Sequence, residues 1–170
     1  MLLINIKFKF KDLDLEFKAD IERNKPHTFE IGEEMLSDKL FWILVGLDKN
    51  YEGEITGEGV CLNASSWNNV LALGDKGMFI RGTVYKNIYK ALRVRSKRAE
   101  AKNRALEVIK LYNLELLSSI KIHLLTDEEL LRVATARAHY RKIALVVAKS
   151  KEIGKIDFTK WQDSYIIKIV

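Results

Sequence analysis

The first eighteen residues read MLLINIKFKFKDLDLEFK, and this stretch decides the fold of the N-terminal part of the chain. Apolar and polar side chains alternate over residues 4–10 and again over residues 13–18. A period of two residues is typical of strands with one buried face. Only Lys11 and Asp12 separate the two runs, so we predict a β-hairpin whose polar faces pair lysines with carboxylates.

The segment that follows mixes short elements with turns. Pro26, the only proline, lies in a predicted loop, and apolar residues at helical spacing predict a helix over residues 34–47. Gly53, Gly57 and Gly59 lie in an acidic stretch that we interpret as flexible. Short strands are predicted over residues 28–31, 60–62, 70–73 and 78–80, with a turn at residues 74–77.

A helical period begins near Thr83 and extends to about Leu117 without a glycine or proline. We therefore predict one long helix with an apolar stripe opposite a basic stripe. The apolar stripe comprises Ile88, Leu92, Ala99 and Leu106, and the basic stripe comprises Lys86, Lys90, Arg93, Lys97 and Arg104.

A second long helix is predicted from Thr126 to about Lys151. Thr126 and Glu129 have the spacing of a capping box, in which each side chain binds the backbone N–H of the other residue. Leu125 and Leu130 have the spacing of a hydrophobic staple. A short strand over residues 119–124 is predicted before this helix, and a closing strand is predicted over residues 164–170.

These elements predict an α+β fold: an N-terminal antiparallel sheet with a short helix, followed by two long helices and a terminal strand. A chain of 170 residues is most simply one domain over residues 1–170. Composition and period both change near residue 83, which marks a candidate sub-boundary between a mainly β part (1–83) and a mainly α part (84–170).

The net charge of +6 is unevenly distributed. Residues 1–85 contain 10 basic and 14 acidic side chains, residues 86–110 contain 9 and 2, and residues 111–170 contain 10 and 7. The middle segment alone therefore carries +7, more than the whole net charge. Such asymmetry bears on binding partners and not on the fold.

This basic segment predicts binding to the phosphate backbone of DNA or RNA, because arrays of lysine and arginine bind phosphates by counterion release. Tyr85 and Tyr89 are candidates for stacking on bases. The same basic surface would also suit an acidic protein partner, in a homo-oligomer or another assembly. The predicted nucleic-acid contacts are Lys86, Lys90, Arg93, Arg95, Lys97, Arg98, Lys102 and Arg104.

Several chemistries have no motif in the sequence. There is no CxxC, HExxH, GxSxG or GxxxxGK[ST] pattern, and the single cysteine, Cys61, lacks a local catalytic signature. No cofactor and no metal site are therefore expected. Asp12, Asp14 and Glu16 alternate along one strand, which leaves a divergent metal-dependent nuclease as a third hypothesis.

The function favoured by the sequence is that of a small nucleic-acid-binding accessory protein without its own catalysis. One cysteine excludes an intramolecular disulfide, which favours a reducing, cytoplasmic location. The longest apolar run, over residues 40–45, is far below the ~20 residues of a membrane span, so no membrane partner is expected.

Overall fold

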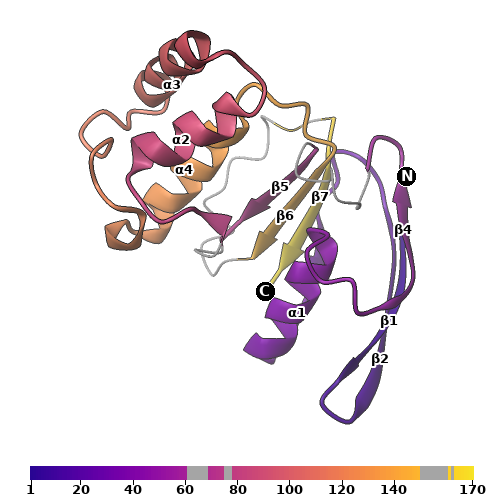
Figure 1. Cartoon of the computed structure of the whole chain (residues 1–170). Coiled ribbons are helices and arrows are strands. Elements are labelled where there is room, and N and C mark those ends of the chain that lie inside the picture. The colour runs from indigo at the N-terminus through magenta and orange to yellow at the C-terminus, as the bar shows by residue number, and fades with distance from the viewer. Residues whose placement is uncertain (61–68, 75–77, 150–160, 162) are drawn as a thin grey trace. The chain divides into compact units, whose positions relative to one another are not determined.

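The computed structural model describes residues 1–60, 69–74, 78–149, 161 and 163–170. The chain groups into two compact units. Unit 1 comprises Met1–Leu73 together with Lys142–Val170, and unit 2 comprises Gly74–Arg141. Figure 1 labels most of the helices and strands of both units. The strands predicted over residues 60–62 and the turn over residues 74–77 lie mostly outside the described residues, and so does Cys61.

The N-terminal antiparallel sheet of unit 1 is confirmed. Strands β1 (Leu2–Phe10) and β2 (Leu13–Ile21) form the predicted hairpin, with Leu2 opposite Ile21 and Phe10 opposite Leu13. Side chains of β1 alternate strictly between buried and exposed, as the period of two requires. Lys7 lies opposite Glu16, and the two side chains form an ion pair of 3.3 Å.

The stretch interpreted as a flexible loop contains a third strand, β4 (Glu52–Gly57), so this interpretation was wrong. The strand pairs with β1 to give the order β2-β1-β4. Gly53 has a φ of +97°, and a Cβ at this position would lie 2.1 Å from the carbonyl oxygen of Asn5. Glycine is therefore required by close strand approach and not by flexibility.

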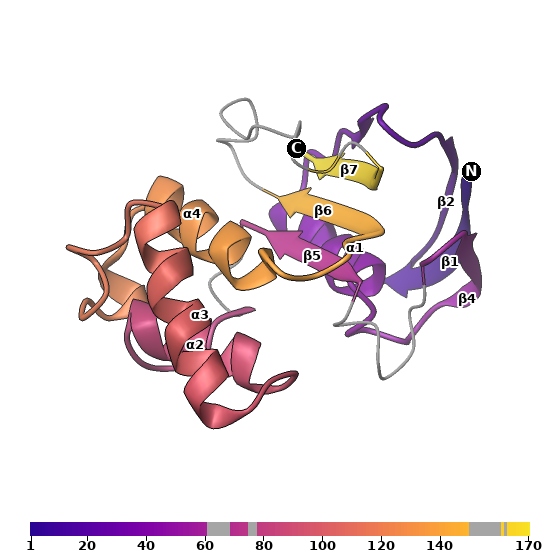
Figure 2. The same cartoon turned by 90° about the horizontal axis from the view of Figure 1, so that it is seen from above.

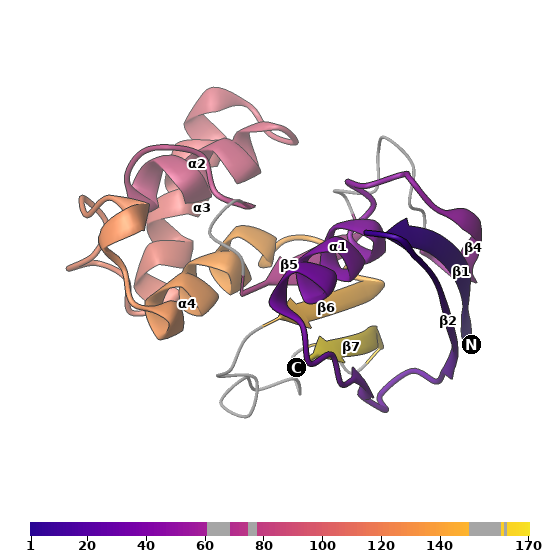
Figure 3. The ribbon, with the colours of Figure 1, turned by 90° about the horizontal axis from the view of Figure 1, so that it is seen from below.

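Unit 1 also contains a parallel sheet, which the sequence analysis did not predict. Its four strands have the order β3-β7-β6-β5, and every neighbouring pair is parallel. Helix α1 (Glu34–Leu44) packs against β6 through a face that includes Leu40, Phe41 and Leu44. Figures 2 and 3 show α1 beside this sheet. The strands are β3 (His27–Phe29), β5 (Val70–Leu73), β6 (Leu145–Lys149) and β7 (Tyr165–Ile169).

The predicted helix from Thr126 to Lys151 was wrong in its second half. Helix α4 (Asp127–Ala138) ends early, and residues 145–149 form strand β6. Leu145 to Ala148 are all buried. A short run that is buried on both faces has no strand alternation, so its pattern cannot be distinguished from that of a buried helix. The closing strand predicted over residues 164–170 is confirmed as β7.

Unit 2 contains three helices in place of the two that were predicted. The long helix over residues 83–117 is divided into α2 (Val84–Arg93) and α3 (Arg98–Leu111). Ser96 ends α2, because its hydroxyl donates to the Leu92 carbonyl oxygen at 2.8 Å and its own carbonyl accepts from Arg93 at 2.9 Å. The break shifts the buried face, so that Ile88 and Leu92 are buried while Ala99 and Leu106 are exposed. The buried face of α3 consists of Ala101, Ala105, Val108 and Ile109.

Two of the short strands predicted near these helices do not form. The described residues of the 78–80 segment are not extended, and the 119–124 segment contains one isolated bridge at Lys121 and a short 3₁₀ helix, η3 (Ile122–Leu124). In the described part of the chain, no helix is both long and apolar enough to span a membrane.

The helix start at Thr126 is confirmed in detail. The Thr126 hydroxyl accepts from the backbone N–H of Glu129 at 3.3 Å, and the Glu129 carboxylate accepts from the backbone N–H of Thr126 at 2.8 Å. The side chains of Leu125 and Leu130, at the staple positions, are both buried.

Replacing Thr126 with alanine is expected to lower the free energy of unfolding by about 0.5–2 kcal/mol, because one N–H at the start of α4 loses its acceptor. Urea unfolding followed by circular dichroism measures this effect. Thr135→Ala in the same helix is the matched control. The Thr135 hydroxyl donates to the Leu131 carbonyl oxygen at 2.9 Å, and this carbonyl already accepts a hydrogen bond within the helix. An equal loss in both variants would show that the cap contributes nothing specific.

Candidate functional site

The predicted basic residues all lie in unit 2, on three consecutive segments. Lys86, Lys90 and Arg93 are on α2, Arg95 and Lys97 are in the break, and Arg98, Lys102 and Arg104 are on α3. All are exposed except Arg104, which is half-buried. Arg104 pairs with Glu100 at 2.8 Å and lies 4.9 Å from the ring centre of Tyr140. Because the helix is broken, these side chains do not form the single straight stripe that was predicted.

The two tyrosines predicted to stack on bases contact each other. The rings of Tyr85 and Tyr89 are 5.9 Å apart and nearly parallel, at 7°. Both side chains are half-buried and pack against the core of unit 2. Each ring therefore already has a stacking partner in the protein.

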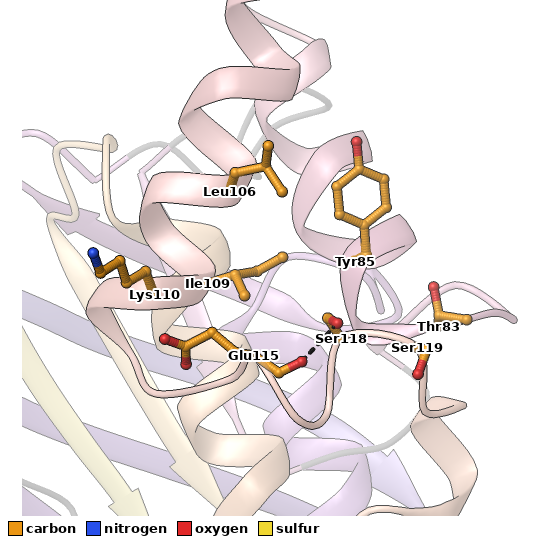
Figure 4. A pocket seen from close by; sticks show the side chains of 8 residues that line it. All are labelled: Thr83, Tyr85, Leu106, Ile109, Lys110, Glu115, Ser118 and Ser119. Carbon is orange, nitrogen blue, oxygen red and sulfur yellow. Dashed lines mark hydrogen bonds between the residues drawn. The ribbon is translucent and has the colours of Figure 1, made fainter.

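A cavity of about 660 Å³ lies beside α2 and α3 in unit 2 (Figure 4). Two of its hydroxyl groups already have backbone partners, since Thr83 accepts from the N–H of Lys86 and Ser118 donates to the carbonyl oxygen of Glu115. No nucleophile paired with a base is present among its lining residues. They are Thr83, Tyr85, Leu106, Ile109, Lys110, Glu115, Ser118 and Ser119.

The carboxylates proposed for a nuclease are poor metal ligands in this structure. Glu16 is paired with Lys18 at 2.9 Å and with Lys7 at 3.3 Å, and these hydrogen bonds hold the pKa of the Glu16 carboxyl below its usual range. Asp14 lies opposite Lys9 in the hairpin. Among the residues that the structure describes, no group of three or more His, Cys, Asp or Glu side chains could hold a metal ion.

The candidate site that the sequence analysis missed is the strand–loop–helix formed by β3 and α1 in unit 1. Strand β3 belongs to the parallel sheet and leads through Gly32 directly into α1. Ligands of open parallel sheets bind at the carboxyl ends of the strands, and a glycine-rich loop between strand and helix is the phosphate-binding arrangement of P-loop proteins. Figure 3 shows α1 beside strands β5, β6 and β7 of this sheet.

The residues at this position differ from those of a phosphate-binding loop. Counted from Gly32 as the first glycine of GxxxxGK[ST], the second glycine falls on Ser37, the lysine on Asp38 and the hydroxyl residue on Lys39. Lys39 is directed elsewhere, because its ammonium pairs with Asp48 at 3.3 Å and lies 5.5 Å from the ring centre of Phe8.

The backbone at this position also differs from that of a phosphate-binding loop. Glu33 is the N-cap of α1, and the helix begins at Glu34, so there is no extended loop after Gly32. The backbone N–H of Ser37 donates to the carbonyl oxygen of Glu33 at 3.0 Å. The amides from Ser37 onward are thus used within the helix and cannot surround a phosphate.

Two ion pairs connect this region to other elements of unit 1. The Lys11 ammonium, in the β1–β2 turn, lies 2.6 Å from the Glu33 carboxylate. Lys149, the last residue of β6, pairs with Asp38 on α1. Lys149 is thus a cation at the carboxyl edge of the parallel sheet, and its partner Asp38 lies on α1.

Comparison with solved structures identifies the fold. A structure described as the dimeric form of MJ0796, a bacterial ABC transporter cassette, is similar with a TM-score of 0.72 and 17% identity, and the match covers 100% of this chain and 88% of that chain. A post-hydrolysis state of the ATP-binding cassette MJ0796, bound to ADP and Pi, has a TM-score of 0.69 and 18% identity, with 100% and 87% covered.

A third similar structure is cbiO1 from Clostridium perfringens, described as part of the ABC transporter complex cbiONQ. Its TM-score is 0.66 and its identity 16%, and the match covers 99% of this chain and 77% of that chain. No protein-family model and no curated protein sequence matches this chain. The similarity therefore establishes the fold, which is that of an ABC transporter cassette.

These structural neighbours overturn the function predicted from the basic segment. Proteins with this fold over the whole chain are described as transporter cassettes, and none of the three is described as a nucleic-acid-binding accessory protein. DNA or RNA as the partner was therefore a wrong prediction. The error came from assigning a function to net positive charge on exposed helices, although charge alone does not distinguish between partners.

Proposed function

We propose that this chain is a cassette subunit of an ATP-driven, ABC-type assembly, in which it pairs with a second cassette that binds and hydrolyses ATP. The observation that carries this proposal is the combination of a cassette fold along the whole chain with a strand–loop–helix that lacks the phosphate-binding residues. The fold supports membership of a cassette assembly, and the absence of a GxxxxGK[ST] motif from the sequence argues against hydrolysis by this chain.

The similar solved structures indicate the kind of assembly. MJ0796 is described as dimeric, with ADP and Pi bound, and cbiO1 is described as part of a transporter complex. Phosphoryl transfer on P-loops depends on a lysine that contacts the phosphates and on side chains that hold Mg²⁺. Since this chain lacks that lysine, an ATP-driven pair that includes it requires a partner with an intact GxxxxGK[ST] motif.

Purification of an affinity-tagged form of the full chain from its native cells tests this proposal. We expect a stoichiometric partner whose sequence contains GxxxxGK[ST], together with ATP turnover by the complex and none by the isolated chain. A crosslinked product that contains the two chains in equal amounts distinguishes a cassette pair from nonspecific association. Turnover by the isolated chain, or recovery of the chain without any such partner, would contradict the proposal.

A further inference from the structure

We infer that the start of α1, where a cassette of this fold would bind phosphate, is occupied by the protein's own ion pairs, and that the Lys149–Asp38 pair holds α1 against the sheet without a nucleotide. The two pairs are Lys11–Glu33 at the start of α1 and Lys149–Asp38 one turn later. This inference rests on the proposed function and concerns how the same site is maintained.

The start of α1 carries negative charge from the protein itself. A helix N-terminus attracts negative charge, which in P-loop proteins is supplied by phosphate. Here Glu33 and Glu34 supply it at the first two positions, and the Glu33 side chain makes no cap hydrogen bond because it is directed to Lys11. A nucleotide phosphate would therefore meet two carboxylates at the place where it needs unoccupied donors.

The carboxyl edge of the parallel sheet carries the second ion pair. The side chain of Lys149 is only 20% exposed, and that of Asp38 is 42% exposed, so this pair is partly shielded from solvent. The pair joins strand β6 to helix α1 through oppositely charged groups. An ammonium at the strand end repels Mg²⁺, and the Asp38 carboxylate that could bind the metal is already paired.

Together, these residues give a charge arrangement that is reversed relative to a P-loop. Acidic side chains belong to the helix, and the cations come from the β1–β2 turn and from the end of β6. Neither the nucleotide phosphates nor Mg²⁺ fit these residues. The Lys149–Asp38 ion pair instead connects the helix to the sheet.

A double-mutant cycle on Asp38→Asn and Lys149→Gln tests the role of the ion pair. Unit 2 (Gly74–Arg141) contains no tryptophan, so urea unfolding followed by tryptophan fluorescence reports on the rest of the chain, which includes Trp42 and Trp161 of unit 1. We expect the effect of the double substitution on the unfolding equilibrium constant to differ by at least about 5-fold from the product of the two single effects. The same cycle on Glu22→Gln and Lys25→Gln, an exposed pair of unit 1, is the control and should show no measurable coupling.

Nucleotide addition to the unmodified chain is the second measurement, and it does not depend on any variant folding. A site with a Kd of about 50 μM would stabilise unit 1 roughly 100-fold in the presence of about 5 mM MgATP. We expect no shift of the unfolding midpoint with MgATP or with MgADP. A shift with either nucleotide, or an Asp38–Lys149 coupling no larger than that of the control pair, would overturn the inference. Neither result would refute the proposed pairing with a second cassette, which is decided by the purification experiment.

Discussion

Replacing Asn87 with alanine is expected to destabilise unit 2 by about 2–4 kcal/mol, because it removes a buried side-chain amide of α2 together with its hydrogen bonds to the backbone of Ile80 and Thr83. Asn87 is 2% exposed. Its side chain accepts from the N–H of Ile80 at 2.9 Å and donates to the carbonyl oxygens of Ile80 at 3.0 Å and of Thr83 at 3.1 Å. These bonds hold the segment before α2 against the helix.

Circular dichroism in urea measures this effect, because helices α2, α3 and α4 all belong to unit 2. Asn103→Ala on the exposed face of α3 is the matched control and should change the stability by less than about 0.5 kcal/mol. If the Asn87 variant were as stable as the control variant, the buried amide would not be what fixes the entry to α2.

Replacing Gly53 with alanine is expected to destabilise unit 1 by about 2–4 kcal/mol, because the new methyl group would collide with the backbone of β1 and the residue would keep a positive φ. The Cβ would lie 2.1 Å from the carbonyl oxygen of Asn5, an atom that cannot move without breaking the pairing of β1 and β4. Tryptophan fluorescence in urea follows the unfolding of this unit.

Gly32→Ala is the control for this substitution. A Cβ at Gly32 meets no atom within 4 Å, and this glycine has no positive φ. We expect its effect on the free energy of unfolding to be within about 0.5 kcal/mol. Equal losses in the two glycine variants would mean that the effect comes from glycine entropy and not from the approach of the strands.

The parts of the fold that could be predicted are the hairpin, which has one buried face, and the start of α4, which is fixed by local contacts. The hairpin of β1 and β2 has one buried face, so its sequence alternates and its register can be predicted. The start of α4 was predictable because Thr126 and Glu129 act locally. The sub-boundary near residue 83, predicted from the change in composition and period, stays a prediction.

The parallel sheet was missed because its central strands are buried on both faces. The buried run from Leu145 to Ala148 therefore resembles the interior of a helix. The division between α2 and α3 was missed for a different reason. Ser96 ends α2 through two hydrogen bonds with the preceding turn, and neither glycine nor proline marks the position.

The candidate site could have been suspected from the order of its elements alone. A short strand ending at Gly32 and a helix over residues 34–47 were both predicted, and this order is the frame of a P-loop. No motif marked this position, because the sequence around Gly32 contains no GxxxxGK[ST] pattern. The structure adds the parallel pairing of β3 with β7 and the Asp38–Lys149 ion pair, which joins α1 to the end of β6.

ATP turnover by the purified cassette pair, measured after the P-loop lysine of the partner has been replaced by methionine, tests the central claim most directly. If this chain does not hydrolyse ATP, all turnover belongs to the partner, and we expect the substitution to abolish it. Crosslinking under the same conditions confirms that the pair is still assembled. Retention of roughly half of the original turnover would show that this chain hydrolyses ATP itself, and would contradict the account.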